Sequence, residues 1–178
     1  VMGLTIMIVL SLIDYTFLLK FVWIYYAGMI VLLLLVLFAG DDAKGAQRWF
    51  EIAGIRFQPS EIAKIILILF FAYFFSRFED SINTVRTLAL SVIFAGIPLF
   101  LILKQPDNST TILTALIFAT LLFISGLSYK IIMPVLGVSV PIVLIVISYI
   151  YTHADALIKK GFYPATRIMS WLDPTNYA

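Results

Sequence analysis

Two charged side chains, Glu61 and Lys64, stand at the start of an apolar stretch and are the first candidates for chemistry. Their spacing, i and i+3, places them on one face of a helix, where a carboxylate and an ammonium neutralise each other. Ionisable groups at membrane depth are costly and therefore count as functional candidates. The alternative is an ordinary pair that only allows the helix to begin, and spacing alone does not separate the two.

More polar residues gather around this pair and in a second island. Residues 45 to 64 read GAQRWFEIAGIRFQPSEIAK, and residues 104 to 111 read KQPDNSTT. In the second island Asp107, Asn108 or Ser109 can cap the helix that follows. Capping would by itself account for that island, so its polarity alone does not indicate a binding site.

The composition indicates a membrane protein. Of the 178 residues, 62% are hydrophobic and only 12% are charged, and the mean hydropathy is +1.07. Soluble domains have roughly 45 to 50% apolar residues and about 25% charged ones. The apolar runs are continuous, whereas barrel strands would alternate, and they are apolar on all sides, unlike the amphipathic helices of a soluble all-α core.

We therefore expect an all-α, polytopic transmembrane bundle with five or six spans. The sequence has no Cys and one His, His153, which excludes disulfides, thiolate metal sites and a His cluster for zinc. The expected spans are Val1 to Ile13, Phe21 to Gly40, Pro59 to Ser76, Thr87 to Leu103, Thr110 to Ser125 and Ile131 to Thr152.

The span that follows the opening stretch has to begin at Pro59. The uninterrupted apolar run from Ile65 to Phe75 would give only about 16 Å of helix, against a hydrocarbon core of about 30 Å. Pro suits the first helical position, where its missing N–H has no partner, and Glu61 then lies in the first turn, where the helix dipole favours a carboxylate. A helix from Pro59 draws Glu61 and Lys64 into the membrane boundary.

Two connecting segments, about 41–58 and 154–178, are long enough to have structure of their own. Residues 48 to 58 alternate around Ala53 and Gly54, so a hairpin would pair Glu51 with Arg56 and Trp49 with Gln58. A plain interfacial loop with Trp49 as an anchor is the alternative. Around Arg167, the residues Tyr163, Pro164, Ile168, Met169, Trp171 and Leu172 indicate a short helix on the membrane surface.

Alternating the connections across a membrane divides the cations unequally. One side receives Lys20, Arg77, Arg86 and Lys130. The other receives Lys44, Arg48, Arg56, Lys64, Lys104, Lys159, Lys160 and Arg167. Taken alone, the positive-inside rule would place the second, richer set in the cytoplasm.

Five motifs in a fixed order resemble the RodA/FtsW/SpoVE (SEDS) family of shape, elongation, division and sporulation proteins. They are GAQRW at 45–49, QPSEIAK at 58–64, QPD at 105–107, SGLS at 125–128 and RIMSWLDP at 167–174. GAQRW followed by QPSE and Lys64 is highly specific, whereas SGLS or QPD alone is not. The sequence departs from the family at Asn108 and Ser109, where Leu-Gly is usual, so the local helix entry is in doubt.

The resemblance implies a bacterial inner-membrane protein of about ten helices. Such a protein polymerises lipid II, a polyprenyl-diphosphate-linked disaccharide peptide, beside a class B penicillin-binding transpeptidase. Residues 1–178 would then be one transmembrane domain fragment, roughly from the second to the seventh helix, in contact with membrane lipids and not with nucleic acid. The family's catalytic Asp would lie after Ala178, so no catalytic residue and no activity are expected in residues 1–178 alone.

The resemblance also places the cation-rich connections outside, where the diphosphate of lipid II needs positive charge. It implies an outward-facing groove with Glu61 and Lys64 as an orienting pair. The groove candidates are Arg48, Trp49, Arg56, Gln58, Pro59, Ser60, Lys104, Gln105 and Asp107. No cofactor is required; a divalent cation that bridges the diphosphate stays open, although the sequence shows no ligand set for a metal.

Two other functions remain open at this point. A lipid II flippase should have polar groups along a path across the bilayer, yet Ile66 to Phe75 and Leu113 to Leu122 are nearly free of strongly polar side chains. A structural scaffold for the division or elongation complex is the second alternative. It leaves the cost of placing Glu61 and Lys64 in the membrane unexplained.

Overall fold

The chain forms two compact units, residues 1–127 and residues 128–178. The computed structural model describes residues 4, 5, 7, 14–39, 41–43, 46–52, 55–105, 107–159, 161 and 163–172. The predicted first span, residues 1–13, therefore lies outside the described residues, apart from three of them.

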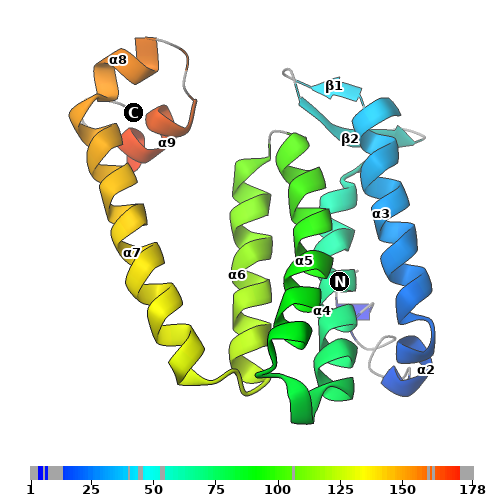
Figure 1. Cartoon of the computed structure of the whole chain (residues 1–178). Helices are drawn as coiled ribbons and strands as arrows, with labels where there is room; N and C mark the ends of the chain where they lie inside the picture. The colour runs from blue at the N-terminus through cyan, green and yellow to red at the C-terminus, as the bar shows by residue number, and fades with distance from the viewer. Residues whose placement is uncertain are drawn as a thin grey trace. The chain divides into compact units, whose positions relative to one another are not determined.

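The first unit is built from helices that stand alongside one another, with a small sheet at one end (Figure 1). Helix α4 contacts α3, α5 and α6 and so lies at the centre of the unit. The helical elements are α2 (Tyr15–Lys20), α3 (Val22–Ala39), α4 (Pro59–Arg77), the short 3-10 helix η1 (Glu79–Ser81), α5 (Val85–Lys104) and α6 (Asn108–Ile124).

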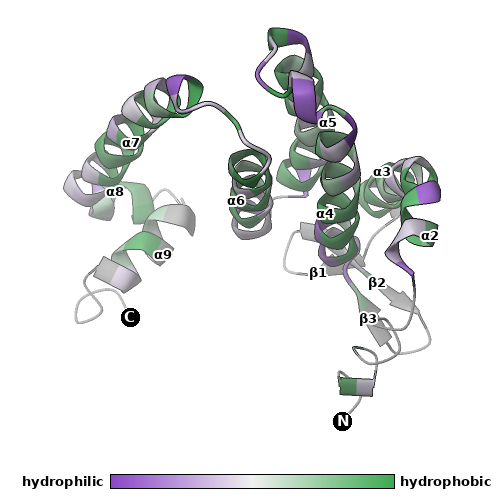
Figure 2. Ribbon diagram, turned by 90° about the horizontal axis from the view of Figure 1, so that it is seen from below, coloured by the Kyte–Doolittle hydropathy of each residue, from purple (hydrophilic) through white to green (hydrophobic). Residues whose placement is uncertain are grey.

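The predicted all-α membrane architecture is confirmed. Three described helices are long and apolar enough to cross a membrane, namely α4, α5 and α7 (Tyr129–Thr152), while α3 and α6 are shorter apolar helices. Figure 2 shows hydrophobic residues along the lengths of these helices. Helix α4 begins at Pro59, as the length of its apolar run required, and carries Glu61 in its first turn.

Aromatic side chains hold the first unit together. Phe70 of α4 lies 5.1 Å from Trp23 and 4.5 Å from Tyr26, both of α3, and 5.3 Å from Phe94 of α5, measured between ring centroids. Phe71 lies 4.8 Å from Phe118 of α6. Helices in lipid associate by close packing rather than by the hydrophobic effect, and aromatic pairs add about 0.5–1.5 kcal/mol each. This cluster therefore joins all four helices through α4.

The segment between α3 and α4 is a sheet and not a plain loop. Strand β2 (Ala46–Ile52) pairs antiparallel with β3 (Ile55–Phe57), and Glu51 stands opposite Arg56 as the hairpin reading predicted. The last pair is Phe50 with Phe57, so Gln58 falls just beyond the strand. A further strand, β1 (Asp41–Ala43), pairs with β2 on its other side and was not predicted. The alternative of a plain loop is wrong, while the role of Trp49 as an interfacial anchor stays a prediction.

A hydrogen bond between α3 and α5 compensates for a proline inside a helix. The Tyr26 hydroxyl donates to the Phe94 carbonyl over 2.8 Å, and Pro98 lies four residues after Phe94 within α5. Proline has no N–H to give to that carbonyl. The tyrosine on the neighbouring helix therefore replaces the hydrogen bond that the proline removes.

We expect Tyr26→Phe to lower the free energy of unfolding by about 1 kcal/mol, because it leaves the Phe94 carbonyl unpaired among apolar side chains. In a Pro98→Ala background the same change should cost clearly less, since an alanine at that position supplies the helical N–H. Thermal unfolding of the purified protein in detergent measures both. An equal loss in the two backgrounds would show that the hydroxyl does not serve this carbonyl.

The second unit contains α7, α8 (Ala154–Lys159) and α9 (Tyr163–Leu172). Helix α7 includes Pro134 and Pro141 and is almost wholly exposed within this unit. Helix α9 lies where the sequence predicted a short helix. Its Ala165 and Met169 are buried, whereas the side chain of Trp171 is exposed. The side chain of Arg167 lies outside the described part of the structure.

Candidate functional site

Two polar connections between helices meet at the end of the first unit that carries the sheet, which we call the hairpin end. One is the segment 41–58 between α3 and α4, which contains the sheet, and the other is the short turn 105–107 between α5 and α6. The side-chain amide of Gln58 donates to Oδ2 of Asp107 over 2.9 Å. Residues 49 positions apart in the sequence are thereby brought together at one end of the bundle.

Asp107 uses both carboxylate oxygens. While Oδ2 accepts from Gln58, Oδ1 accepts from the backbone N–H of Thr110 over 3.1 Å and caps α6. The capping role predicted for this segment therefore belongs to Asp107. Only 6% of Asp107 is exposed, and a carboxylate at the start of a helix is stabilised by the helix dipole. Helix α6 begins at Asn108, directly after this cap.

Within the part of the chain that the structure describes, two buried polar atoms at this end have no hydrogen-bond partner. Gln105 is 1% exposed; its amide nitrogen donates to the Leu33 carbonyl of α3 over 3.2 Å, while its Oε1 has no partner. The hydroxyl of Ser60, in the first turn of α4, is also buried and unpartnered. Buried polar groups in native proteins are rarely left unpaired, so these atoms mark positions suited to a water or a ligand group.

Glu61 and Lys64 form an ion pair on the first turns of α4. The Lys64 ammonium lies 2.8 Å from one carboxylate oxygen and 2.9 Å from the other. The pair is unequally exposed, since 58% of the Glu61 side chain is accessible but only 16% of that of Lys64. The lysine is therefore the member that depends more on its partner for charge compensation.

The remaining predicted residues differ in how far they are buried. Pro59 is buried at the start of α4, and Trp49 of β2 is partly buried. Lys104 is exposed, with its ammonium 5.4 Å from the centre of the Phe100 ring on the same helix. Arg48 and Arg56 lie on β2 and β3, but their side chains are outside the described part of the structure.

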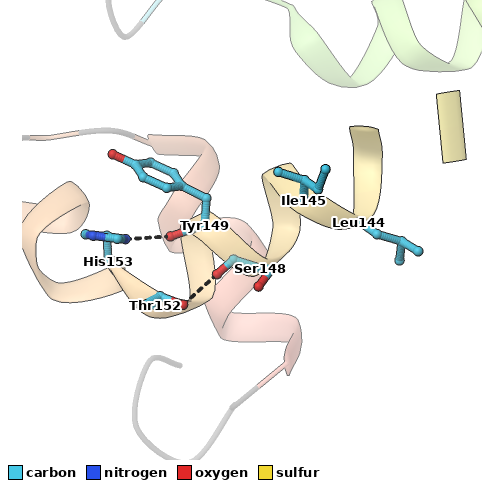
Figure 3. Close-up of a pocket in the computed structure, with 6 residues that line it drawn as sticks. All are labelled: Leu144, Ile145, Ser148, Tyr149, Thr152 and His153. Carbon is cyan, nitrogen blue, oxygen red and sulfur yellow. Dashed lines mark hydrogen bonds between the residues drawn. The ribbon is translucent and has the colours of Figure 1, made fainter. Parts of the chain in front are cut away.

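A hollow in the second unit is lined mainly by apolar surface and is not a polar site. It measures about 440 Å³ and is lined by six residues of α7 and its end (Figure 3): Leu144, Ile145, Ser148, Tyr149, Thr152 and His153. The Thr152 hydroxyl donates to the Ser148 carbonyl, and His153 Nδ1 lies 3.2 Å from the Tyr149 carbonyl. These polar groups interact with their own helix. Among the described residues no three His, Cys, Asp or Glu side chains are arranged to hold a metal ion.

The sequence did not predict the hydrogen bonds of Gln58 and Gln105: it offered Trp49 as the cross-strand neighbour of Gln58 and no partner for Gln105. The available signal is the repeated Gln-Pro pair, at 58–59 and 105–106. In each case the glutamine occupies the cap position of a helix end: Gln58 stands directly before α4 and Gln105 directly after α5.

This arrangement, apolar helices joined by polar turns, is that of a multi-pass membrane protein. The chain belongs to the FtsW/RodA/SpoVE family, whose model, described as "Cell cycle protein", matches residues 1–178.

Relatives and solved structures agree with this family. The peptidoglycan glycosyltransferase MrdB of Escherichia coli K12 is 36% identical over 177 residues, which are 98% of this chain and 45% of MrdB. A probable peptidoglycan glycosyltransferase FtsW of Thiomicrospira cyclica is 31% identical over 85% of this chain and 38% of its own length. The chain thus spans less than half the length of these relatives.

Among solved structures, the rod shape determining protein RodA of Thermus thermophilus matches with a TM-score of 0.63 and 26% identity. The match covers 76% of this chain and 44% of RodA. A chain from a structure titled "Structural coordination of polymerization and crosslinking by a peptidoglycan synthase complex" matches with a TM-score of 0.71 and 25% identity. It covers 97% of this chain and 48% of that one.

Proposed function

We propose that this chain is part of a peptidoglycan glycosyltransferase that polymerises lipid II at the outer face of the bacterial inner membrane. The observation that carries the proposal is the polar hairpin end, where Gln58 and Asp107 bond to each other next to the Glu61–Lys64 pair. It stands in a chain whose curated relatives are named peptidoglycan glycosyltransferases. The two units would belong to one transmembrane domain.

The hairpin end would hold the lipid-linked diphosphate. Arg48 and Arg56 lie on paired strands of the hairpin, and Lys64 and Lys104 lie on the two helices beside it. Cations in a site of low dielectric bind phosphate oxygens strongly. Trp49 between them is suited to packing against the substrate or the hairpin. A divalent cation on the diphosphate is compatible with this account but is not required by it.

Polymerisation requires a base and a stabilised leaving group. The acceptor hydroxyl oxygen would bond to the anomeric carbon of the donor sugar as the bond from that carbon to the diphosphate breaks, with inversion. The base would be an Asp outside residues 1–178. The residues of this chain would bind and orient the donor and stabilise negative charge on the departing diphosphate, with Glu61 and Lys64 as an orienting pair.

A transpeptidase of the class B penicillin-binding type is the proposed partner, because newly made glycan strands need crosslinking. The similarity to a chain from a peptidoglycan synthase complex supports this proposal. Lipids of the inner membrane would surround the exposed apolar surfaces of the helices.

The alternative of a lipid flippase is less well supported by the interior of the first unit. The buried residues of α4 from Leu67 to Phe75 are apolar, and four of them are phenylalanines: Phe70, Phe71, Phe74 and Phe75. A transport route for a diphosphate and sugars would need polar groups at this depth. The buried aromatic cluster fits a site confined to one end of the bundle.

The test is a polymerisation assay with the purified full-length gene product, labelled lipid II and no other polymerase. We expect glycan strands on a gel, and none from residues 1–178 alone. In a parallel assay, proteoliposomes with fluorescent lipid II measure translocation. Translocation without strands would support the flippase, and the absence of both activities would support a scaffold. Strands made by residues 1–178 alone would contradict the proposed position of the base.

A further inference from the structure

The candidate groove residues are carried by two turns that belong to different helix pairs. The hairpin connects α3 to α4, and the 105–107 turn connects α5 to α6. Side chains on separate turns hold a substrate well only if the turns keep a fixed separation, because small displacements at a site cost large factors in rate. A contact that fixes the separation of the two turns would therefore keep the proposed site in its binding geometry.

Hydrogen bonds of Asp107 and Gln105 tie the 105–107 turn to neighbouring segments. Gln58 donates to Asp107, and Gln105 donates to the Leu33 carbonyl of α3. Gln58 occupies the N-cap position of α4, yet its side chain makes no capping bond there. Its amide instead reaches the carboxylate that caps α6. A bond to an ionised acceptor is stronger than one between neutral groups, and Asp107 is largely shielded from water.

We propose that the hydrogen bond from Gln58 to Asp107, which we call the Gln58–Asp107 bridge, fixes the hairpin relative to the start of α6. Gln58 is thereby a positioning residue for the groove. This inference rests on the proposed function for its effect on activity, but not for its effect on structure. The bridge holds Asp107 in one orientation, and Gln105 forms a second connection from the same turn to α3.

The chemistry of the bridge permits an exchange of donor and acceptor. In the double variant Gln58→Glu with Asp107→Asn, the amide is at the start of α6 and the carboxylate is at the start of α4, so the hydrogen bond and the total charge are both retained. The side-chain oxygen of the introduced asparagine can still accept from Thr110 and cap α6. A carboxylate at position 58 lies at the start of α4, where the helix dipole favours it. Gln58→Glu alone instead leaves two carboxylate acceptors facing each other, whereas Asp107→Asn alone still permits an amide–amide hydrogen bond and is not used as a test.

The structural readout is the distance between spin labels on cysteines introduced at Gln47 of β2 and at the exposed Ile112 of α6. The 178 residues contain no cysteine, so these labels are unique in this part of the protein. We expect a narrow distance distribution in the parent protein and in the double exchange variant. Gln58→Glu and the near-isosteric Gln58→Met should each broaden it. Equal widths in all variants, or a double variant as broad as Gln58→Glu, would overturn the proposal.

The kinetic readout is lipid II polymerisation by the same full-length variants. Gln58→Met should lower kcat/KM about ten-fold, the order expected for the loss of a hydrogen bond to a charged group, and the exchange variant should recover most of it. Recovery of the distance without recovery of the rate would support the bridge and assign the Asp107 charge a further role. Failure of the proposed function would appear separately, as a parent protein that makes no strands.

Discussion

Glu61→Gln in the full-length gene product is expected to lower the rate of lipid II polymerisation by at least about ten-fold, and Lys64→Met by clearly less. The structure gives the reason, because the two side chains are unequally buried: 58% of Glu61 is accessible but only 16% of Lys64. Removing the carboxylate leaves the cation of the less exposed side chain uncompensated, which costs more than leaving the exposed carboxylate alone.

The double variant separates pairing from independent action. If the ion pair orients the first turns of α4, then Glu61→Gln with Lys64→Met should be no slower than Glu61→Gln alone, since no buried charge remains unpaired. The measurement is the polymerisation rate at equal protein level. Exposed charges far from the pair, Glu79→Gln and Lys20→Met, serve as matched controls that should retain the parent rate. Losses that multiply in the double variant would show that the residues act separately, and the pairing account would have to be given up.

The features that the sequence predicted are those set by local chemistry. The start of α4 at Pro59 followed from the length of its apolar run. The Glu51–Arg56 pairing was one of two interpretations of residues 48 to 58, and Asp107 was one of three candidates for the cap of α6. Each depends on residues within a few positions of one another. Local rules of helix initiation and strand register are sufficient in such cases.

The features that were missed depend on contacts between distant segments. Gln58 meets Asp107 across 49 positions, and Tyr26 meets the Phe94 carbonyl across 68. Strand β1 pairs with β2 although its sequence, Asp-Asp-Ala, is a poor strand former. Tertiary packing decides these contacts, and hydrophobic periodicity does not report which polar side chain of one helix end reaches another.

The unequal burial of Glu61 and Lys64 could not be predicted from the sequence either. Residues at i and i+3 share a helix face, but the neighbouring helices determine which of the two is covered. Spacing alone would therefore predict a strong loss of activity from each single change. The structure replaces that expectation with the asymmetric one given above.

We propose that the hairpin end faces the cell exterior as a substrate site, and cysteine labelling determines on which side of the membrane it lies. Single cysteines at Ala46 on β2 and at Glu79, at the opposite end of α4, are placed in the full-length gene product and treated with a membrane-impermeant maleimide. We predict that Ala46→Cys is labelled in intact spheroplasts and that Glu79→Cys is labelled only after the inner membrane is opened. The reverse pattern, which the positive-inside rule alone would favour, would contradict the account.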